Sequence, residues 1–139
     1  MEFEFSPEEQ QFRAEVRAML AEQLPDPGAD VEVGDPAFEA RLAEQGWLTA
    51  AWPKEFGGRG ATQIQQLIMK EELVRIGAAL PGQGINLVGP TLMVHGSDEQ
   101  RRQHLPKIAA AEIRWCQGFS EPGAGSDLAS LQTRAIRDG

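Results

Sequence analysis

The chain has 139 residues, enough for a domain with a buried core, and its 41% hydrophobic and 24% charged content is typical of soluble globular proteins. A formal net charge of −8 argues against a nucleic-acid-binding protein, because such proteins present a basic face. No apolar run is long enough to span a bilayer, and the acidic start Met1–Phe5 does not resemble a signal peptide, so we expect a cytoplasmic protein.

The first helix has a clear start signal. Ser6–Glu9 combines an N-cap serine, a proline at N1 and a glutamate at the capping-box position, which predicts a helix from Pro7. Apolar residues follow on one face at helical spacing: Phe12, Val16, Met19 and Leu20. Pro25–Gly28 should end this helix, and a surface loop is expected from there to Gly34.

A second, shorter helix is predicted to start at Asp35-Pro36 and to stop at Gly46. It carries two apolar residues one turn apart, Phe38 and Leu42. An irregular connection rich in glycine then runs to Gly60 and contains three large aromatic residues: Trp47, Trp52 and Phe56. Because large aromatics dominate core burial, we expect them to pin this loop to the core, the alternative being an aromatic binding box.

A third helix is predicted from Thr62 to about Ala79, with a broad apolar arc that should pack on more than one side. The arc consists of Ile64, Leu67, Ile68, Met69, Leu73, Val74 and Ile76. Glu71 and Glu72 are adjacent and therefore point to different helix faces. We expect a solvated edge there rather than a pair of catalytic acids.

A nearly uncharged helix is predicted from Ile85 to His95, and such a helix is either buried or lines an apolar cavity. Gly89-Pro90 within it predicts a kink or a close backbone approach, and His95 is placed to cap the last carbonyls.

A last helix should begin at the capping box Ser97–Gln100 and end near Ala111, with a kink or restart at Pro106. Its apolar residues are Leu105 and Ile108.

After Glu112 the pattern changes. Residues 113–119 are too few for a helix and have strand character, and residues 131–137 alternate like a second strand. Antiparallel strands need partners for their backbone groups, so we expect the chain to be truncated at Gly139, just after a β domain has begun. The predicted fold is mainly α, with a helical domain over 1–112 and the beginning of a β domain over 113–139.

Cysteine and histidine are sparse in this chain. Cys116 is the only cysteine, so no internal disulfide can form. Its place in a strand-like apolar run predicts a packed, inert thiol, the alternative being a nucleophile paired with a histidine. With only His95 and His104 besides, there is no clustered metal-ligand spacing, and no metal site is predicted.

The loop Ser120–Asp127 lies between the two predicted strands. Gly123 and Gly125 would let backbone amides approach a ligand closely, and successive free N–H groups suit anions or polar cofactor edges. An ordinary turn after a strand explains the same residues. The Rossmann pattern G-x-G-x-x-G fails at Leu128, and no G-K-S or G-K-T follows. A cofactor bound here would need another geometry.

Three motifs give the chain a close resemblance to the acyl-CoA dehydrogenase family. Ser120–Asp127 matches the family's T/S-E-P-x-A-G-S-D flavin signature without a break. Residues 51–60 resemble its W-P-x-E-(Y/F)-G-G-x-G connection. Gly96–Gln100, followed by Arg101, resembles its G-(S/T)-x-x-Q-(K/R) helix start. The motifs occur in the family's order, and the resemblance covers the whole chain.

The resemblance implies an oxidoreductase of three parts: an N-terminal helical domain, a middle β domain and a C-terminal helical bundle. FAD would lie between the β domain and the bundle, partly across a subunit contact of a homo- or hetero-tetramer. The acyl chain would lie between the helical domains, with Ile85–His95 as one wall of its pocket. Electron-transfer flavoprotein would be the electron acceptor.

The same match implies five flavin-binding residues: Gln117, Phe119, Ser120, Gly125 and Ser126. The backbones of the first two and the Ser120 hydroxyl would meet the isoalloxazine ring, and the last two would lie toward the ribityl-pyrophosphate. Ser126 would also contact the CoA thioester arm of the substrate. Serine at 120 replaces a common threonine and keeps the hydroxyl donor. Gln117 departs from the family's pattern, which is compatible with bulky substrates.

The implied reaction oxidises an acyl-CoA to its 2,3-enoyl-CoA, as in fatty-acid β-oxidation. A carboxylate removes the α-proton while the β-hydrogen leaves as hydride to the flavin. The family's catalytic glutamate belongs to the C-terminal bundle, so no catalytic residue is expected here and the chain alone should be inactive. Glu121 is expected to brace the loop.

Two other functions remain open. One is a non-catalytic acyl-CoA dehydrogenase-like subunit that keeps the helical domain and the flavin loop for binding or assembly. The other is an unrelated small helical interaction module.

Overall fold

The structure, a computed structural model, describes residues 4–24 and 35–138. Its helices are α1 (Pro7–Gln23), α2 (Pro36–Glu44), α3 (Gln63–Arg75), α4 (Gly89–His95) and α5 (Asp98–Ala109). Single turns of other helix types are η1 (Lys54–Phe56), η2 (Gly84–Val88) and η3 (Leu128–Ser130). The loop predicted from Pro25 to Gly34 lies outside the described residues.

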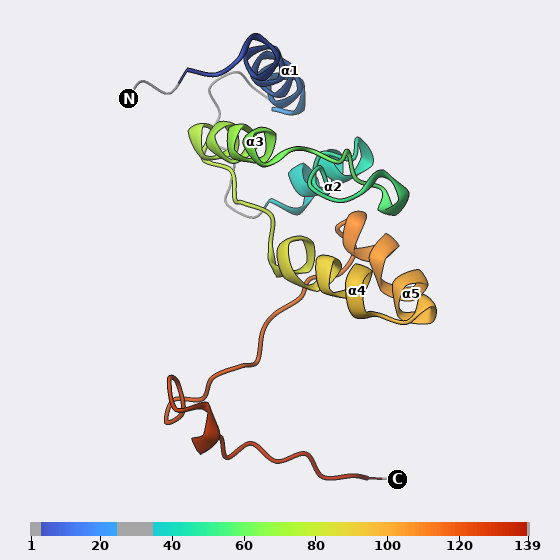
Figure 1. Ribbon diagram of the computed structural model, residues 1–139, viewed down its shortest axis with the longest axis vertical. Helices are drawn as coiled ribbons and strands as arrows, with labels where there is room; N and C mark the ends of the chain where they lie inside the picture. Colours follow the sequence, from blue (N-terminus) through green and yellow to red (C-terminus); the bar gives the residue numbers. More distant parts are fainter. Residues whose placement is uncertain (1–3, 25–34, 139) are drawn as a thin grey trace.

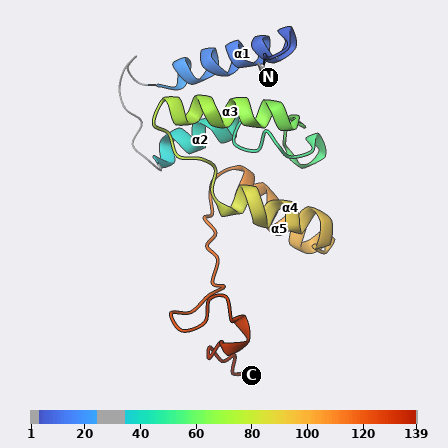
Figure 2. The same cartoon turned by 60° about the vertical axis from the view of Figure 1, so that its left-hand side comes forward.

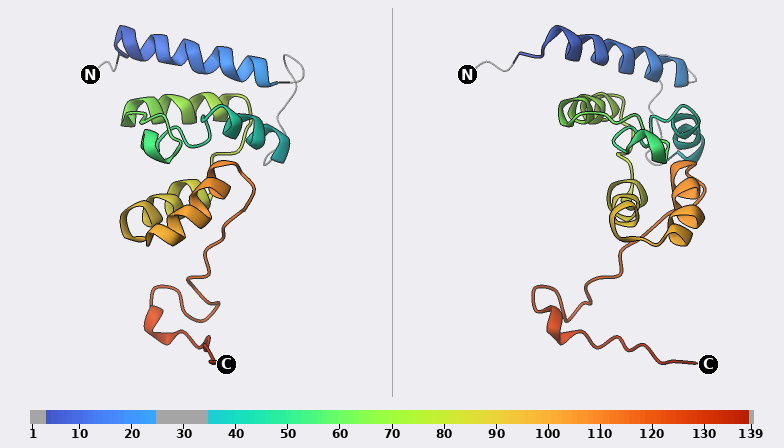
Figure 3. Two further views of the ribbon diagram at one scale, coloured as in Figure 1. Left: turned by 90° about the vertical axis from the view of Figure 1, so that its right-hand side faces the viewer. Right: turned by 45° about the vertical axis from the view of Figure 1, so that its right-hand side comes forward.

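The helices stack in layers along the longest axis of the molecule (Figure 1). α1 lies at one end, α2 and α3 form the next layer, and α4 and α5 form the third (Figure 3). α1 and α3 run side by side and share the most extensive helix–helix contact (Figure 2). The segment after α5 leaves this stack and extends away from it.

Side-chain caps begin the long helices where the sequence predicts them. Ser6, Thr62 and Ser97 each form a full capping box at the start of α1, α3 and α5. The Asp35 carboxylate accepts from the Ala37 backbone N–H at 2.9 Å and so caps α2. Each cap satisfies amide groups that have no partner within the helix, which is why these starts can be predicted locally.

Helix ends agree less well with prediction. α3 ends at Arg75 rather than near Ala79, because Gly77 takes a left-handed conformation (φ +73°) that turns the chain back. Ala78 N–H then donates to the Leu73 carbonyl at 3.0 Å. At the end of α4, Arg101 Nε donates to the Leu92 carbonyl at 3.2 Å. Arg101 therefore caps a carbonyl of the last turn, the role predicted for His95.

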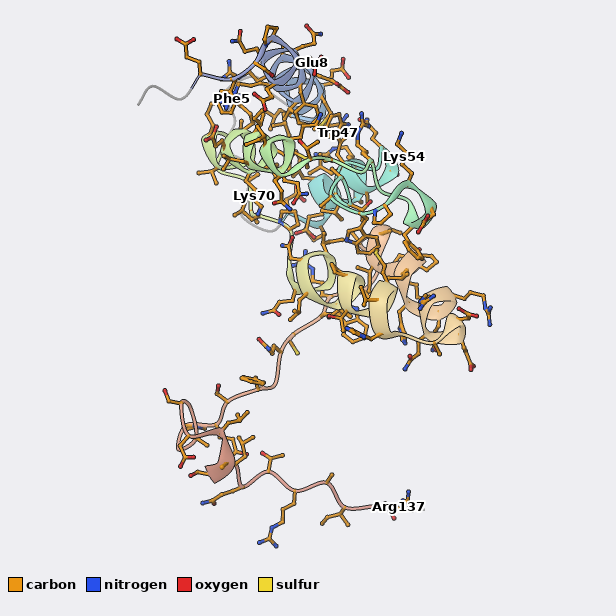
Figure 4. The ribbon with its side chains drawn as sticks, viewed as in Figure 1. Phe5, Glu8, Trp47, Lys54, Lys70 and Arg137 are labelled. Atoms are coloured by element: carbon orange, nitrogen blue, oxygen red, sulfur yellow. The ribbon has the colours of Figure 1, made fainter. Side chains whose placement is uncertain are left out.

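The core lies where the irregular loop meets the helices. Trp47 and Trp52 are buried and Phe56 is half-buried, which confirms that the loop aromatics pin this connection. Trp47 also packs near the ring of Phe12 and lies 3.9 Å below the guanidinium of Arg59. Figure 4 shows it between α1 and the layer of α2 and α3. The other buried hydrophobic residues include Val16, Met19, Leu20, Phe38, Leu42, Met69, Leu73, Ile85, Leu105 and Ile108.

Glu72 contradicts the prediction of a solvated acidic edge on α3. Its side chain is only 1% exposed and pairs with three guanidinium groups: Arg13 at 2.7 Å, Arg17 at 2.9 Å and Arg75 at 2.7 Å. Its neighbour Glu71 stays partly solvated and pairs with Arg13 at 2.6 Å. Two of these arginines come from α1, so the buried carboxylate ties α1 to α3.

Two helix faces are more exposed than predicted. On α3, Val74 and Leu67 face solvent, so this helix packs on one side instead of several. On the uncharged segment, Ile85 and Gly89 are buried while Leu87 and Val94 are exposed. The uncharged helix is therefore half-buried, with an apolar face left outward.

The mainly α fold is confirmed, but the two predicted strands do not form a ladder. Within 4–24 and 35–138 the only β pairing is an isolated bridge between Glu121 and Ala124. Residues 113–119 and 131–137 are extended yet unpaired with each other. A strand is defined by its hydrogen-bonded neighbour, so extended segments without that neighbour carry no sheet.

Candidate functional site

The chain leaves the helices through a tight reversal after α5. Ala111 adopts a left-handed conformation (φ +58°), which is uncommon for a residue with a Cβ. Trp115 then packs back on the helical part, edge-on to His104 with ring centroids 5.5 Å apart. Beyond Trp115 most residues are exposed, apart from the half-buried Glu121 and the buried Ala124. Arg137 lies near the far end of this segment (Figure 4).

The loop of the signature closes in a four-residue turn. Glu121 and Ala124 exchange backbone hydrogen bonds of 3.1 and 3.0 Å across Pro122-Gly123. The pair puts Ser120 and Gly125 on the two outward arms of the turn. After it, the Ser130 hydroxyl bonds the Asp127 carboxylate at the turn η3.

Glu121 braces this loop, as expected from the sequence. Its carboxylate accepts from the backbone N–H groups of Gln132 at 2.9 Å and Thr133 at 2.6 Å, and also from the Thr133 hydroxyl. The hydroxyl of Thr133 and the two amides favour the charged form and lower the pKa of Glu121. The brace therefore joins the turn to the segment that follows η3.

Replacing Glu121 by glutamine should loosen this brace, because a neutral amide oxygen accepts more weakly than a carboxylate. Amide hydrogen exchange at Gln132 and Thr133 should become several-fold faster. In the unchanged chain the same loosening should appear as the pH falls through the lowered pKa of Glu121, since the bonds favour its charged form. Unchanged exchange in both experiments would show that the brace is absent in solution.

The five residues predicted to bind flavin all lie on the exposed part of this segment. Phe119 keeps 57% of its surface open, although large aromatics are usually buried. A Cβ added at Gly123 or Gly125 would meet no atom within 4 Å. These glycines are therefore not required by packing within the chain, and the space beside them is open to a ligand.

Cys116 contradicts the prediction of a packed thiol, because its side chain is exposed next to Trp115. The alternation of an extended segment put Trp115 rather than Cys116 against the helices. In the described part of the chain, no group of three or more acidic, cysteine or histidine side chains could hold a metal ion. Nor is any helix described there both long and apolar enough to cross a membrane.

Residues 6–112 match the family model described as "Acyl-CoA dehydrogenase, N-terminal domain". The chain belongs to the acyl-CoA dehydrogenase family. This membership accounts for the helical stack of α1 to α5, which coincides with the matched range.

Curated members of the family align along the entire chain. Acyl-CoA dehydrogenase FadE26 of Mycobacterium tuberculosis is 41% identical over 149 residues, covering 100% of this chain and 37% of the relative. Acyl-CoA dehydrogenase FadE29 of the same organism is also 41% identical, with 38% of the relative covered. The chain thus spans little more than a third of the length of these relatives.

Solved acyl-CoA dehydrogenase structures share the fold. One is a chain of the ChsE4-ChsE5 complex from Mycobacterium tuberculosis, with a TM-score of 0.82 and 40% identity, covering 100% of this chain and 37% of that one. Another is the Tcur3481-Tcur3483 steroid ACAD, with a TM-score of 0.83, 39% identity and coverage of 100% and 38%. The first is named as a complex, and the name of the second joins two components.

Proposed function

We propose that this chain supplies the N-terminal helical domain (1–112) and the start of the middle β domain (113–139) of an FAD-dependent acyl-CoA dehydrogenase. The reaction is the oxidation of an acyl-CoA thioester to the 2,3-enoyl-CoA. The observation that carries the proposal is 41% identity over the whole chain, signature loop included, to relatives named acyl-CoA dehydrogenase.

The exposed loop fits a flavin. Gln117, Phe119 and Ser120 offer backbone groups, an open ring and a hydroxyl donor on one extended arm. Gly125 and Ser126 follow on the other arm, where a Cβ added at Gly125 would meet no atom of the described residues within 4 Å. When bound there, FAD supplies the hydride acceptor of the reaction.

The outward face of the uncharged segment fits the acyl chain. Leu87 is 46% exposed and Val94 is 69% exposed, and Thr91 lies between them on the same side of the helix. Exposed apolar side chains on a helix without charges favour contact with an apolar ligand. We assign this face as one wall of the acyl pocket.

The residues of this chain position the substrate rather than react with it. The Ser126 hydroxyl would hold the thioester arm, and the helix wall would orient the acyl carbons. By the family resemblance, the catalytic base would belong to a C-terminal bundle outside this chain, and Glu121 instead accepts hydrogen bonds from Gln132 and Thr133. The chain alone is therefore inactive, and electron-transfer flavoprotein would reoxidise the assembled enzyme.

The two-component complexes among the similar structures favour a hetero-oligomeric assembly. One of them is named a steroid ACAD, and we propose a bulky, steroid-type acyl-CoA as the substrate of the enzyme to which this chain belongs. A binding or assembly role without catalysis is the second candidate. It predicts a purified assembly without flavin absorbance or acyl-CoA oxidation.

The decisive experiment is to tag this chain in its native host, purify the assembly, and measure flavin absorbance and acyl-CoA oxidation with an artificial electron acceptor. Ser126→Ala should raise KM for the acyl-CoA about 5- to 20-fold, the cost of one lost hydrogen bond, while FAD content is kept. Ser130→Ala is the control for a general disturbance of the loop, because this hydroxyl lies outside the signature but bonds the Asp127 carboxylate next to Ser126. Equal effects of both variants would contradict the assignment of Ser126.

A further inference from the structure

The π turn η2 leaves one buried carbonyl without its usual backbone donor. The N–H of Gly89 donates to the carbonyl of Gly84, five residues back. In an α-helix the same N–H would have bonded the carbonyl of Ile85. The residue five positions after Ile85 is Pro90, which has no N–H to donate. Ile85 is buried, so its carbonyl needs a partner from elsewhere.

The indole of Trp52 supplies that partner. Its Nε1–H donates to the Ile85 carbonyl at 2.9 Å in a buried contact between residues 33 positions apart. Gly89 lies directly against the same ring, because an added Cβ would stand 2.1 Å from Trp52 Cζ2. A buried donor and a close backbone approach therefore meet on one side chain, which is itself 2% exposed.

The register of η2 decides which side chains face outward. A π turn adds one residue to the helix, and one residue corresponds to about 100° of rotation. In the observed register Ile85 points inward and Leu87 outward, while Val88 packs against the core. A return to α-helical hydrogen bonding would rotate Leu87 relative to Thr91 and Val94. The apolar wall would change shape.

We propose that Trp52 is a positioning residue that holds the π register and thereby sets the acyl-chain preference of the enzyme. The inference rests on the proposed function, since the outward face of η2 and α4 is the assigned wall of the acyl pocket. Trp52 does not touch the substrate. It acts through its hydrogen bond to the Ile85 carbonyl and through the packing of Gly89 against its ring.

The test uses Trp52→Phe in the purified assembly, which keeps an aromatic ring but removes the N–H. We expect kcat/KM for a steroid acyl-CoA relative to octanoyl-CoA to change about tenfold, the effect of one buried hydrogen bond, with FAD content unchanged. The crystal structure of the variant should show Gly89 N–H bonded to Ile85. Trp47→Phe is the matched control, because it alters another buried tryptophan of the same loop.

A second variant separates register from packing. Pro90→Ala supplies a backbone N–H five residues after Ile85, which can bond the Ile85 carbonyl only while the π register is kept. Where the crystal structure of the double variant shows this bond, the substrate ratio lost in Trp52→Phe should return. If Trp52→Phe alone does not fold, the double variant Trp52→Phe/Pro90→Ala still tests the proposal. It should fold and show the substrate ratio of the wild type. Loss of indole volume alone would not be rescued by a backbone donor.

The outcomes distinguish the two proposals. An unchanged substrate ratio, an equal change in Trp47→Phe, or no return of the ratio in a double variant whose crystal structure keeps the π register overturns the role of Trp52. The proposed function then still stands on the activity of the wild-type assembly. A wild-type assembly that oxidises no acyl-CoA overturns both.

Discussion

Replacing Gly58 by alanine should lower the free energy of unfolding by about 3 kcal/mol or more, the range of severe overpacking. A Cβ at this position would lie 2.0 Å from the carbonyl oxygen of Trp52, 2.4 Å from its carbonyl carbon and 2.6 Å from its Cβ. Backbone atoms cannot rotate away as a flexible side chain could. The chain must therefore move, and Trp52 with it.

Urea denaturation followed by tryptophan fluorescence measures this effect. Gly82→Ala is the matched control, because an added Cβ there meets nothing within 4 Å. Its midpoint should change little. If both alanine variants unfold at the same urea concentration, the close approach of Gly58 to Trp52 is not present in solution.

Replacing Glu72 by glutamine should cost about 2 to 4 kcal/mol, somewhat less than breaking a fully buried ion pair, because its arginine partners keep some solvent. Arg13, Arg17 and Arg75 would converge on a neutral amide that can accept fewer of their bonds. The same change at Glu71, which is 45% exposed, should cost under about 1 kcal/mol. Equal losses at both positions would contradict a special role for the buried carboxylate.

The contribution of Glu72 should also depend on pH. Burial acts to raise its pKa, but the hydrogen bonds from Arg17, Arg75 and Arg13 together outweigh this and leave the pKa at about 2, against an ordinary value of 4.5. Because the folded value is lowered, the stabilisation is complete above pH 4.5 and is lost as the pH falls toward 2. The stability difference between wild type and Glu72→Gln should shrink over this range.

Local signals in the sequence were sufficient for the helix starts. Ser6, Asp35, Thr62 and Ser97 each cap the helix that follows, because capping involves residues at most three positions apart. Gly46 likewise ends the second helical segment in a left-handed conformation. The signature loop could also be recognised from the sequence, because its residues are contiguous and can be compared directly with the family's motif.

Hydrogen-bond and ion-pair partners that lie far apart in the sequence could not be predicted from local patterns. The prediction of a solvated acidic edge was wrong at Glu72, because two of the arginines that pair with it lie more than 50 positions away in the sequence, on α1. The prediction of a kink or a close backbone approach at Gly89-Pro90 is confirmed by the close approach of Gly89 to the Trp52 ring. It did not identify Trp52 as the donor to the Ile85 carbonyl. The strands predicted after Glu112 need neighbours that the sequence pattern does not identify.

The sequence by itself determined the starts of α1, α2, α3 and α5, the aromatic anchors of the connecting loop, and the family to which the chain belongs. Each of these rests on spacing within a few residues or on contiguous motifs. Only the tertiary structure decided that Glu72 is buried, that the Trp52 indole donates to a carbonyl of the π turn, and that Cys116 is exposed. The reason is that burial and hydrogen-bond partnership depend on which distant segment packs against a residue, and no local pattern records that neighbour.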